Sequence, residues 1–352
     1  MKQIKPYFLL PFIALSLIIG IWTGWIRLGW SFPLAQNMGD HGALMAGGFI
    51  GTLICLERTV SYKNRLALII PLINALSIVF FLLKLPHIAF WFLLAGSIGL
   101  SLIYLKLYFE FNETYILIMM AGSFCYLIGN TFLIKTSFYP LSAMWWIAFL
   151  YFTILGERLE LSKYLQIKTI HKIILIVLLA VYIIGILIPF YSSGGYVTAV
   201  SFIGSAVWLF KYDMAKKSLQ REGQHFYSGV VLLAGYVWLV ITGLFMAYGA
   251  YSGLLYDAAI HSFFLGFVFS MIFAHAPIIL PGVLKLQINV FNRFLYLWFF
   301  LLQISLLMRI LNPFILSSDL KLISGLLNGI AILGFLVNMA VLVKAGKSKI
   351  AL

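Results

Sequence analysis

The stretch that decides the fold is residues 40–58, DHGALMAGGFIGTLICLER. Its middle is apolar and rich in glycine and alanine, with an Asp-His pair at its start and a Glu-Arg pair at its end. A run of this length and hydrophobicity fits a helix that crosses a bilayer. Ionisable side chains near lipid are costly, so both ends of the helix are candidates for a functional role.

The rest of the chain has the same character. Hydrophobic residues make up 63% of the 352 residues and charged residues only 10%, more apolar surface than a soluble protein can bury. We therefore predict an all-α, polytopic membrane bundle of about twelve transmembrane helices, with no soluble domain between them. The expected spans are 7–26, 38–57, 66–84, 87–107, 114–134, 141–158, 170–190, 194–211, 226–249, 257–280, 289–310 and 321–344.

The basic residues predict the orientation. The net charge is +14, and with the N-terminus inside, 19 of the 24 Lys and Arg residues fall on the inner side. By the positive-inside rule, both termini are expected in the cytoplasm. The charge then reflects topology and attraction to the anionic lipid bilayer, so no nucleic-acid partner is expected. The five outer residues are Arg27, Lys84, Lys135, Arg309 and Lys321.

Residues 40–58 are weakly similar to two later stretches of the chain. Aligning Gly48 with Gly266 places Glu57 over His275, and aligning it with Ala148 places Glu57 over Glu157. This spacing of roughly 100 residues suggests a threefold internal repeat. We therefore expect a single integral membrane domain, 1–352, built from three pseudo-symmetric arcs of four helices, about 1–112, 113–224 and 225–352.

Two histidines stand near the expected outer ends of helices 2 and 10. Asp40 directly precedes His41, and Asp257 lies one helical turn before His261. A carboxylate in such a position can accept a proton from one imidazole nitrogen and leave the other for iron or copper. Met45 and Gly48 share a face with His41, where small residues permit a flat cofactor or a second helix to approach.

A second constellation stands at the expected inner ends. Glu57, Glu157 and His275 occupy equivalent positions of the three repeats. They could bind a metal ion or relay protons, or they could form a structural belt of ion pairs with Arg58 and Arg158. The two cysteines fall inside spans, so no disulfide framework is indicated. Cys55 fits a small buried hydrophobic residue better than a soft metal ligand.

Two features of this pattern resemble known families. Twelve helices in three arcs, with histidines on helices 2 and 10, are similar to the plan of haem-copper oxidase subunit I. The run Asp40–Phe49 (DHGALMAGGF) and the run His261–Gly266 (HSFFLG), followed by Met271-Ile272, resemble the NnrS family of membrane proteins. That family is associated with haem, copper and nitric oxide stress. The resemblance implies that His41 and His261 are axial ligands of a b-type haem.

The departures from the oxidase pattern reduce the number of metal centres that we expect. Helix 6 has no histidine, helix 7 lacks a His-His pair, and Ala259 and Phe263 stand where a second histidine of helix 10 would be. A full oxygen or nitric oxide reductase centre with its copper site is therefore not expected. Of the remaining histidines, His275 could serve a second centre. No CxxCH motif is present, which excludes a covalent c-type haem.

The resemblance to the NnrS family implies a haem-binding protein of a bacterial inner (cytoplasmic) membrane, and this is the function that we favour. It would handle nitric oxide or transfer electrons with a redox partner, and the sequence assigns no reaction to it. The alternative is a metal-ion or small-solute transporter that uses the same His, Asp and Glu residues. Transporters commonly have inverted repeats and helices broken at mid-membrane, whereas Pro277 and Pro281 fall at the expected end of helix 10. A scaffold that binds partner subunits is a third possibility.

Overall fold

The computed structural model describes residues 6–33, 39–62, 64–188, 193–249, 253–283 and 286–350. Helices account for nearly all of these residues, and the described ranges contain no β-strand. Ten of the described helical segments are long and apolar enough to cross a membrane. Two more, Leu66–Leu82 and Gly195–Tyr212, are shorter or less apolar. Each of the twelve expected spans therefore contains a helix, and the all-α polytopic fold is confirmed.

The chain divides into two compact units, Met1–Gly156 and Glu157–Leu352, and each is described by itself. The boundary falls in the last turns of one long helix. The three arcs of four helices that the sequence repeat suggests stay a prediction.

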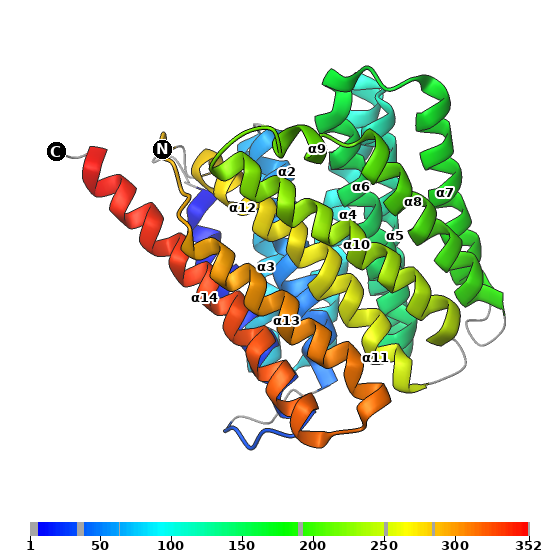
Figure 1. The fold of residues 1–352 in the computed structure, drawn as a ribbon, viewed down its shortest axis with the longest axis vertical. Helices are drawn as coiled ribbons and strands as arrows, with labels where there is room; N and C mark the ends of the chain where they lie inside the picture. Colours follow the sequence, from blue (N-terminus) through cyan, green and yellow to red (C-terminus); the bar gives the residue numbers. More distant parts are fainter. Residues whose placement is uncertain are drawn as a thin grey trace. The chain divides into compact units, whose positions relative to one another are not determined.

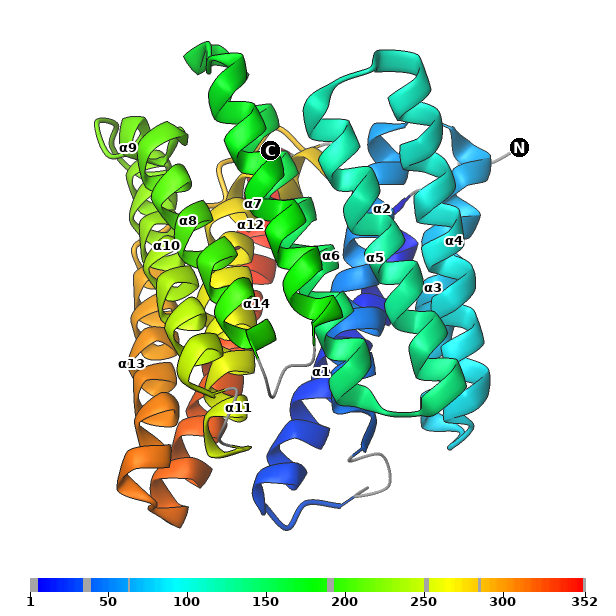
Figure 2. The same cartoon turned by 90° about the vertical axis from the view of Figure 1, so that its right-hand side faces the viewer.

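The first unit contains six spans. Its second span joins a π-helical segment, η3, to an α-helix. Figure 2 shows α3, α4 and α5 side by side, and η3 packs against α1 and α3. The elements are α1 (Leu10–Leu28), η3 (Ala43–Gly51), α2 (Thr52–Ser61), α3 (Ile69–Leu82), α4 (Pro86–Phe111), α5 (Thr114–Thr136) and α6 (Tyr139–Leu161).

The second unit begins in the last turns of α6 and is organised around α10, which packs against α8, α11, η7 and α12 (Figure 1). The helix pairs α7 with α8 and α13 with α14 flank it. The elements are α7 (Thr169–Leu187), α8 (Gly195–Tyr212), α9 (Ala215–Ser218), α10 (Gln224–Gly249), α11 (Gly253–His261), η7 (Ser262–Val268), α12 (Phe269–Val283), α13 (Phe294–Ile315) and α14 (Ser318–Ile350).

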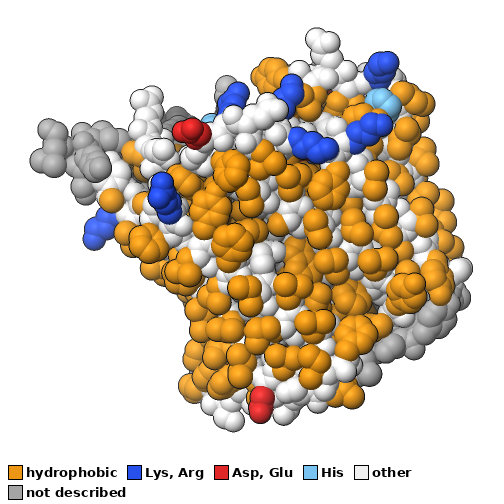
Figure 3. Space-filling view, in the orientation of Figure 1, with side chains coloured by type: hydrophobic (Ala, Val, Ile, Leu, Met, Phe, Trp, Pro, Cys, Tyr) orange, Lys and Arg blue, Asp and Glu red, His pale blue; other side chains and the backbone are white. Residues whose placement is uncertain are grey.

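Apolar side chains cover the outer surface of the helices. On α13 the large residues at a spacing of three and four are all exposed, whereas the opposite side of the helix is buried. In water such a stripe would be an aggregation hazard, but in a bilayer it faces lipid. Figure 3 shows the same apolar cover over the second unit, with Lys and Arg gathered mainly along one rim. The exposed stripe of α13 is Leu297, Phe300, Ile304, Leu307 and Leu311.

Helix 10 ends three residues later than expected. Its expected span stops at residue 280, before Pro281-Gly282, whereas α12 ends at Val283, so Pro277 and Pro281 lie in its last turns, at the end where we expected them. Proline is tolerated inside membrane helices where neighbouring side chains bond the carbonyls that it disturbs. Here the Ser228 hydroxyl of α10 donates to the carbonyl of Ala274, at 2.8 Å, in the turn before Pro277.

Candidate functional site

The two helices that carry the predicted histidine ligands share a rare backbone feature. His41 lies two residues before η3, and His261 lies directly before η7. Both segments are π-helical over at least seven residues, whereas π-helices are uncommon and concentrate at functional sites. Each span therefore leaves regular α-helical geometry immediately after its histidine.

In the first unit, the imidazole of His41 is held by the backbone of α1. Its Nδ1 lies 2.7 Å from the carbonyl oxygen of Gly20. A carbonyl can only accept, so Nδ1 carries the proton and Nε2 carries the lone pair that can bind a metal. The close approach depends on Gly20 and Gly24, which are four residues apart in a small-xxx-small pattern. A Cβ atom at Gly24 would lie only 2.9 Å from Cε1 of His41.

The other residues expected on the His41 face also pack against α1. A Cβ at Gly20 would lie 2.6 Å from Sδ of Met45, and a Cβ at Gly48 would lie 3.2 Å from Oγ of Ser16. Met45 and Gly48 therefore make the close helix contact that small residues allow, which is the packing alternative considered for them.

The π-helical turn of η3 is supported by a buried polar cluster. Nδ2 of Asn74, on α3, donates to the carbonyl of Gly47 at 3.0 Å and to Oγ1 of Thr52 at 2.8 Å. The Tyr126 hydroxyl, on α5, donates to Oδ1 of Asn74 at 3.1 Å and approaches the carbonyl of Gly47 at 3.4 Å. These side chains bond a backbone carbonyl within the irregular segment, which would be costly to leave unpaired away from water.

Asp40 has a different partner from the one we expected. Its Oδ1 accepts a hydrogen bond of 2.5 Å from the Tyr139 hydroxyl. Partial burial raises the pKa of the Asp40 carboxyl above its usual value, while the hydrogen bond from Tyr139 and the nearby His87 oppose that shift. The acceptor for the His41 proton is thus the Gly20 carbonyl of a packed neighbouring helix.

In the second unit, His261 has the carboxylate contact that its spacing predicts. Its Nδ1 lies 2.9 Å from the carbonyl oxygen of Asp257 and 3.2 Å from Oδ1 of the same residue. The carboxylate also receives two hydrogen bonds from Arg309 on α13, each 3.0 Å long. Nδ1 of His261 is therefore the protonated nitrogen, as in His41, and Nε2 is the nitrogen suited to a metal.

The segment η7 is packed tightly against α10. The ring of Trp238 occupies the space over Gly266, where a Cβ would lie 2.5 Å from Cγ of the indole. The Thr242 hydroxyl donates to Oγ of Ser262 at 3.1 Å. Gly266, which the sequence repeat singled out, thus allows α10 to approach the π-helical turn.

The residues expected at the inner ends have other contacts within their units. Nη1 of Arg158 donates to Nε2 of His275 at 2.7 Å, and the same guanidinium makes a bidentate pair with Asp213, at 2.8 and 2.6 Å. Arginine cannot accept, so Nε2 of His275 is the acceptor and is occupied. The carboxylate of Glu57 lies 3.9 Å from Arg58, a contact of the ion-pair belt considered above.

The structure gives no support to the inner metal site expected from Glu57, Glu157 and His275. Across the described ranges, no group of three or more His, Cys, Asp or Glu side chains is placed to hold a metal ion. Arg158 and Asp213 are almost fully buried, with 3% and 0% of their side chains exposed. Asp213 also accepts from Tyr236 and from the amide of Ala215. This cluster ties α6, α8, α10 and α12 together.

Sequence reasoning missed several of these residues. Asn74 is the one side-chain amide in the largely apolar span 66–84, and that contrast was a usable signal. The Gly20-xxx-Gly24 pattern was another. Nothing local marked Tyr126 or Asp213, because their roles depend on which helices become neighbours.

A family model described as a domain of unknown function (DUF8744) matches residues 7–344. No curated protein matches the chain significantly. No solved structure matches it significantly either.

Proposed function

We propose that this chain, which belongs to the DUF8744 family, is a haem-binding protein of a bacterial inner membrane, in which His41 and His261 would hold one b-type haem. Its work would be electron transfer or the handling of nitric oxide, as the resemblance to the NnrS family implies. Both termini would then lie in the cytoplasm, as the distribution of Lys and Arg predicts.

The observation that carries this proposal is that the two imidazoles have the same tautomer and the same kind of hydrogen-bond acceptor. Each donates its Nδ1 proton to a backbone carbonyl, of Gly20 at 2.7 Å and of Asp257 at 2.9 Å. Metal-bound histidines almost always have such a second-shell acceptor, which fixes the tautomer and orients the ring. The π-helical segment after each histidine is a second feature that both helices share.

The donor chemistry fits a haem with two neutral nitrogen ligands. A haem held by these two imidazoles would supply one-electron transfer. The protein's part is to hold His41 with Gly20 and Gly24, and to hold His261 through Asp257 and Arg309. A copper site is not part of this proposal.

The proposal is tested by the optical spectrum of the full chain purified from haem-replete cells. We expect a Soret band, sharp α and β bands on reduction, and a pyridine haemochrome of the b type. The double variant His41→Ala, His261→Ala should lose this pigment. The matched control removes two exposed histidines, His87→Ala and His225→Ala, and should keep it.

Two outcomes would refute the proposal. One is a haem-replete preparation that is well folded but has no Soret absorption. The other is a pigment that persists in the variant without His41 and His261, because the iron would then have other ligands.

The contacts of Asp257 weigh against the alternative of a cation transporter. A transport site needs a carboxylate whose charge is available to the cargo, whereas both oxygens of Asp257 receive hydrogen bonds from Arg309. Arginine stays protonated in proteins, so the pair is neutral overall. Metal uptake into vesicles by pigment-free protein would favour the transporter.

A further inference from the structure

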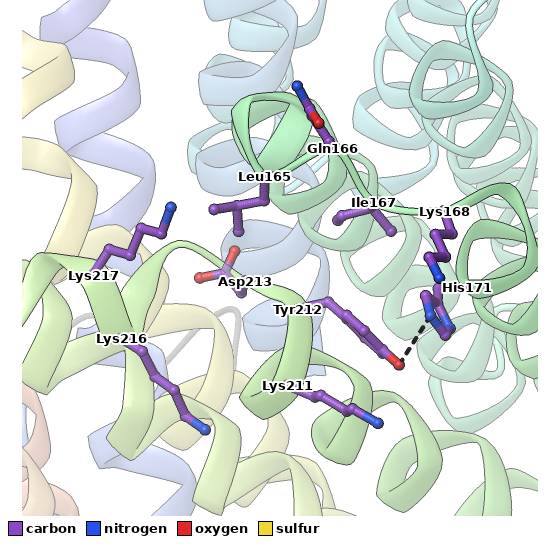
Figure 4. Close-up of a pocket in the computed structure, with 10 residues that line it drawn as sticks. All are labelled: Leu165, Gln166, Ile167, Lys168, His171, Lys211, Tyr212, Asp213, Lys216 and Lys217. Atoms are coloured by element: carbon purple, nitrogen blue, oxygen red, sulfur yellow. Dashed lines mark hydrogen bonds between the residues drawn. The ribbon is translucent and has the colours of Figure 1, made fainter.

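A cavity of 410 Å³ lies in the second unit, and neither His261 nor its hydrogen-bond partners line it. It is formed by two stretches of chain, the connection that leads into α7 and the end of α8 with α9 (Figure 4). Both stretches stand at helix ends, where a membrane protein meets the lipid head groups. Neither histidine ligand of the proposed haem lines it.

The cavity is strongly basic. Four lysines line it, Lys168 from one stretch and Lys211, Lys216 and Lys217 from the other. Figure 4 shows these four side chains distributed around the space, not on one side of it. The one carboxylate in the lining belongs to Asp213, whose charge is already matched by its bidentate pair with Arg158. The four ammonium groups are therefore not balanced within the cavity.

An aromatic wall carries a buried polar atom that lacks a partner. The rings of His171 and Tyr212 are stacked with their centroids 4.3 Å apart, and the Tyr212 hydroxyl lies 3.4 Å from Nε2 of His171. Nδ1 of His171 is buried, and no hydrogen-bond partner for it is found among the described residues. A buried nitrogen without a partner costs free energy, which an oxygen of a bound ligand would relieve.

The first turn of α7 adds to the preference for an anion. Lys168 is the N-cap of this 19-residue helix and has no side-chain cap. The N-terminus of a helix carries partial positive charge and free amide donors, which favour phosphate. Four lysines, an unpartnered imidazole nitrogen and a helix N-terminus thus lie around one space.

The helix that bears one wall of the cavity, α7, also has an exposed apolar stripe. Ile170, Ile174 and Val177 follow a spacing of four and three residues along α7, and 43–55% of each is exposed. Ile174 is three residues after His171, so this apolar stripe starts at the helix face that bears the cavity wall. A ligand with a charged head and apolar tails would match both parts, whereas a free anion would use only the first.

We propose that this cavity binds the phosphate group of an anionic phospholipid from the surrounding bilayer, with its acyl chains along the exposed face of α7. The lysines supply charge, and His171 and Tyr212 supply hydrogen-bonding groups. This site does not depend on the proposed haem, and it holds one lipid in place beyond the general attraction of a basic protein to the membrane surface.

The test measures lipid binding to the full-length protein in detergent by native mass spectrometry. Dioleoylphosphatidylglycerol is titrated against the wild type, and dioleoylphosphatidylcholine serves as the zwitterionic comparison. We expect one phosphatidylglycerol to bind before all others. Replacing the four lysines by glutamine should weaken that first step by tenfold or more, since each basic residue near a membrane surface contributes roughly a fivefold effect.

The matched control removes the same charge elsewhere. The variant Lys84→Gln, Lys135→Gln, Lys321→Gln and Lys344→Gln leaves the cavity intact and should bind the first lipid as the wild type does. If the cavity variant fails to fold, the double change Lys216→Gln and Lys217→Gln, at two exposed positions, should give a smaller loss in the same direction. Equal weakening in the control and cavity variants would overturn the proposal, because the effect would then be one of net charge.

A competition experiment separates the two sources of phosphate. Sodium phosphate is compared with sodium chloride at equal ionic strength while phosphatidylglycerol is bound. Displacement equal in the two salts supports the lipid, because it reflects screening alone. Selective displacement by phosphate, with no preference for phosphatidylglycerol over phosphatidylcholine, would overturn the lipid assignment in favour of a free phosphate.

Discussion

Replacing Asn74 with leucine should disturb the π-helical segment that follows His41. Leucine is close to asparagine in size and shape, so it fits against Gly96, but it removes all three hydrogen bonds of the amide. The carbonyl of Gly47 and the hydroxyls of Thr52 and Tyr126 each lose a partner.

The size of the effect follows from these three contacts. Side-chain hydrogen bonds in membrane proteins average roughly 0.6 kcal/mol each, so their loss amounts to about 2 kcal/mol. A group left fully unpaired would add about 1–3 kcal/mol. Because Tyr126 can move closer to the Gly47 carbonyl, we expect a loss of about 2–3 kcal/mol in the free energy of unfolding.

Reversible unfolding in mixed micelles with increasing dodecyl sulfate measures this loss. A double-mutant cycle with Tyr126→Phe should give a coupling energy of about 0.5–1.5 kcal/mol, because the two side chains share a hydrogen bond. In the same samples the haem spectrum should change, since η3 and His41 belong to one span. The matched control is Asn338→Leu, which breaks a reciprocal amide pair with Asn292 in the second unit and should leave the spectrum unchanged.

A variant Asn74→Leu as stable as the wild type, with no coupling to Tyr126, would refute this reasoning. It would mean that the cluster does not support the π-helical turn, and that backbone bonds within the span suffice. A loss of stability with an unchanged haem spectrum would show that the conformation of η3 does not affect His41.

Two further changes test the second unit. Arg158→Met leaves Asp213 buried without its cation and should lower the free energy of unfolding by about 3–5 kcal/mol in the same assay. Adding Asp213→Leu should recover most of this loss. If Arg158→Met alone is as stable as the wild type, the two residues do not form a buried ion pair. Gly266→Ala forces a methyl group against the Trp238 ring and should lower the free energy of unfolding by about 1–3 kcal/mol. The control Gly39→Ala, where an added Cβ meets no atom within 4 Å, should change it little. Equal effects at the two glycines would show that α10 does not approach η7 closely.

The sequence by itself determined the fold class and the position of every span. Hydrophobicity along a membrane helix is a local property of about 20 consecutive residues, so a span such as 114–134 is recognised without knowledge of its neighbours. The spacing of Asp257 and His261 likewise predicted their contact, because residues four apart on a helix share a face. The inner metal site expected from Glu57, Glu157 and His275 gained no such support, since it was inferred from a repeat and not from local geometry.

Only the tertiary structure decided which groups bond His41, Asp40 and Asp213. Asp40 is adjacent to His41 in the chain, yet its hydrogen-bond partner is Tyr139. His41 instead donates a hydrogen bond from Nδ1 to a backbone carbonyl of α1. Asn74 and Asp213 acquire their roles from helices far away in the sequence. The physical reason is that lipid offers no hydrogen-bond partner, so buried polar groups bond whichever donor or acceptor the packed helices bring within about 3 Å. The identity of these partners depends on which helices pack together, and the pattern of hydrophobic spans carries no information about that packing.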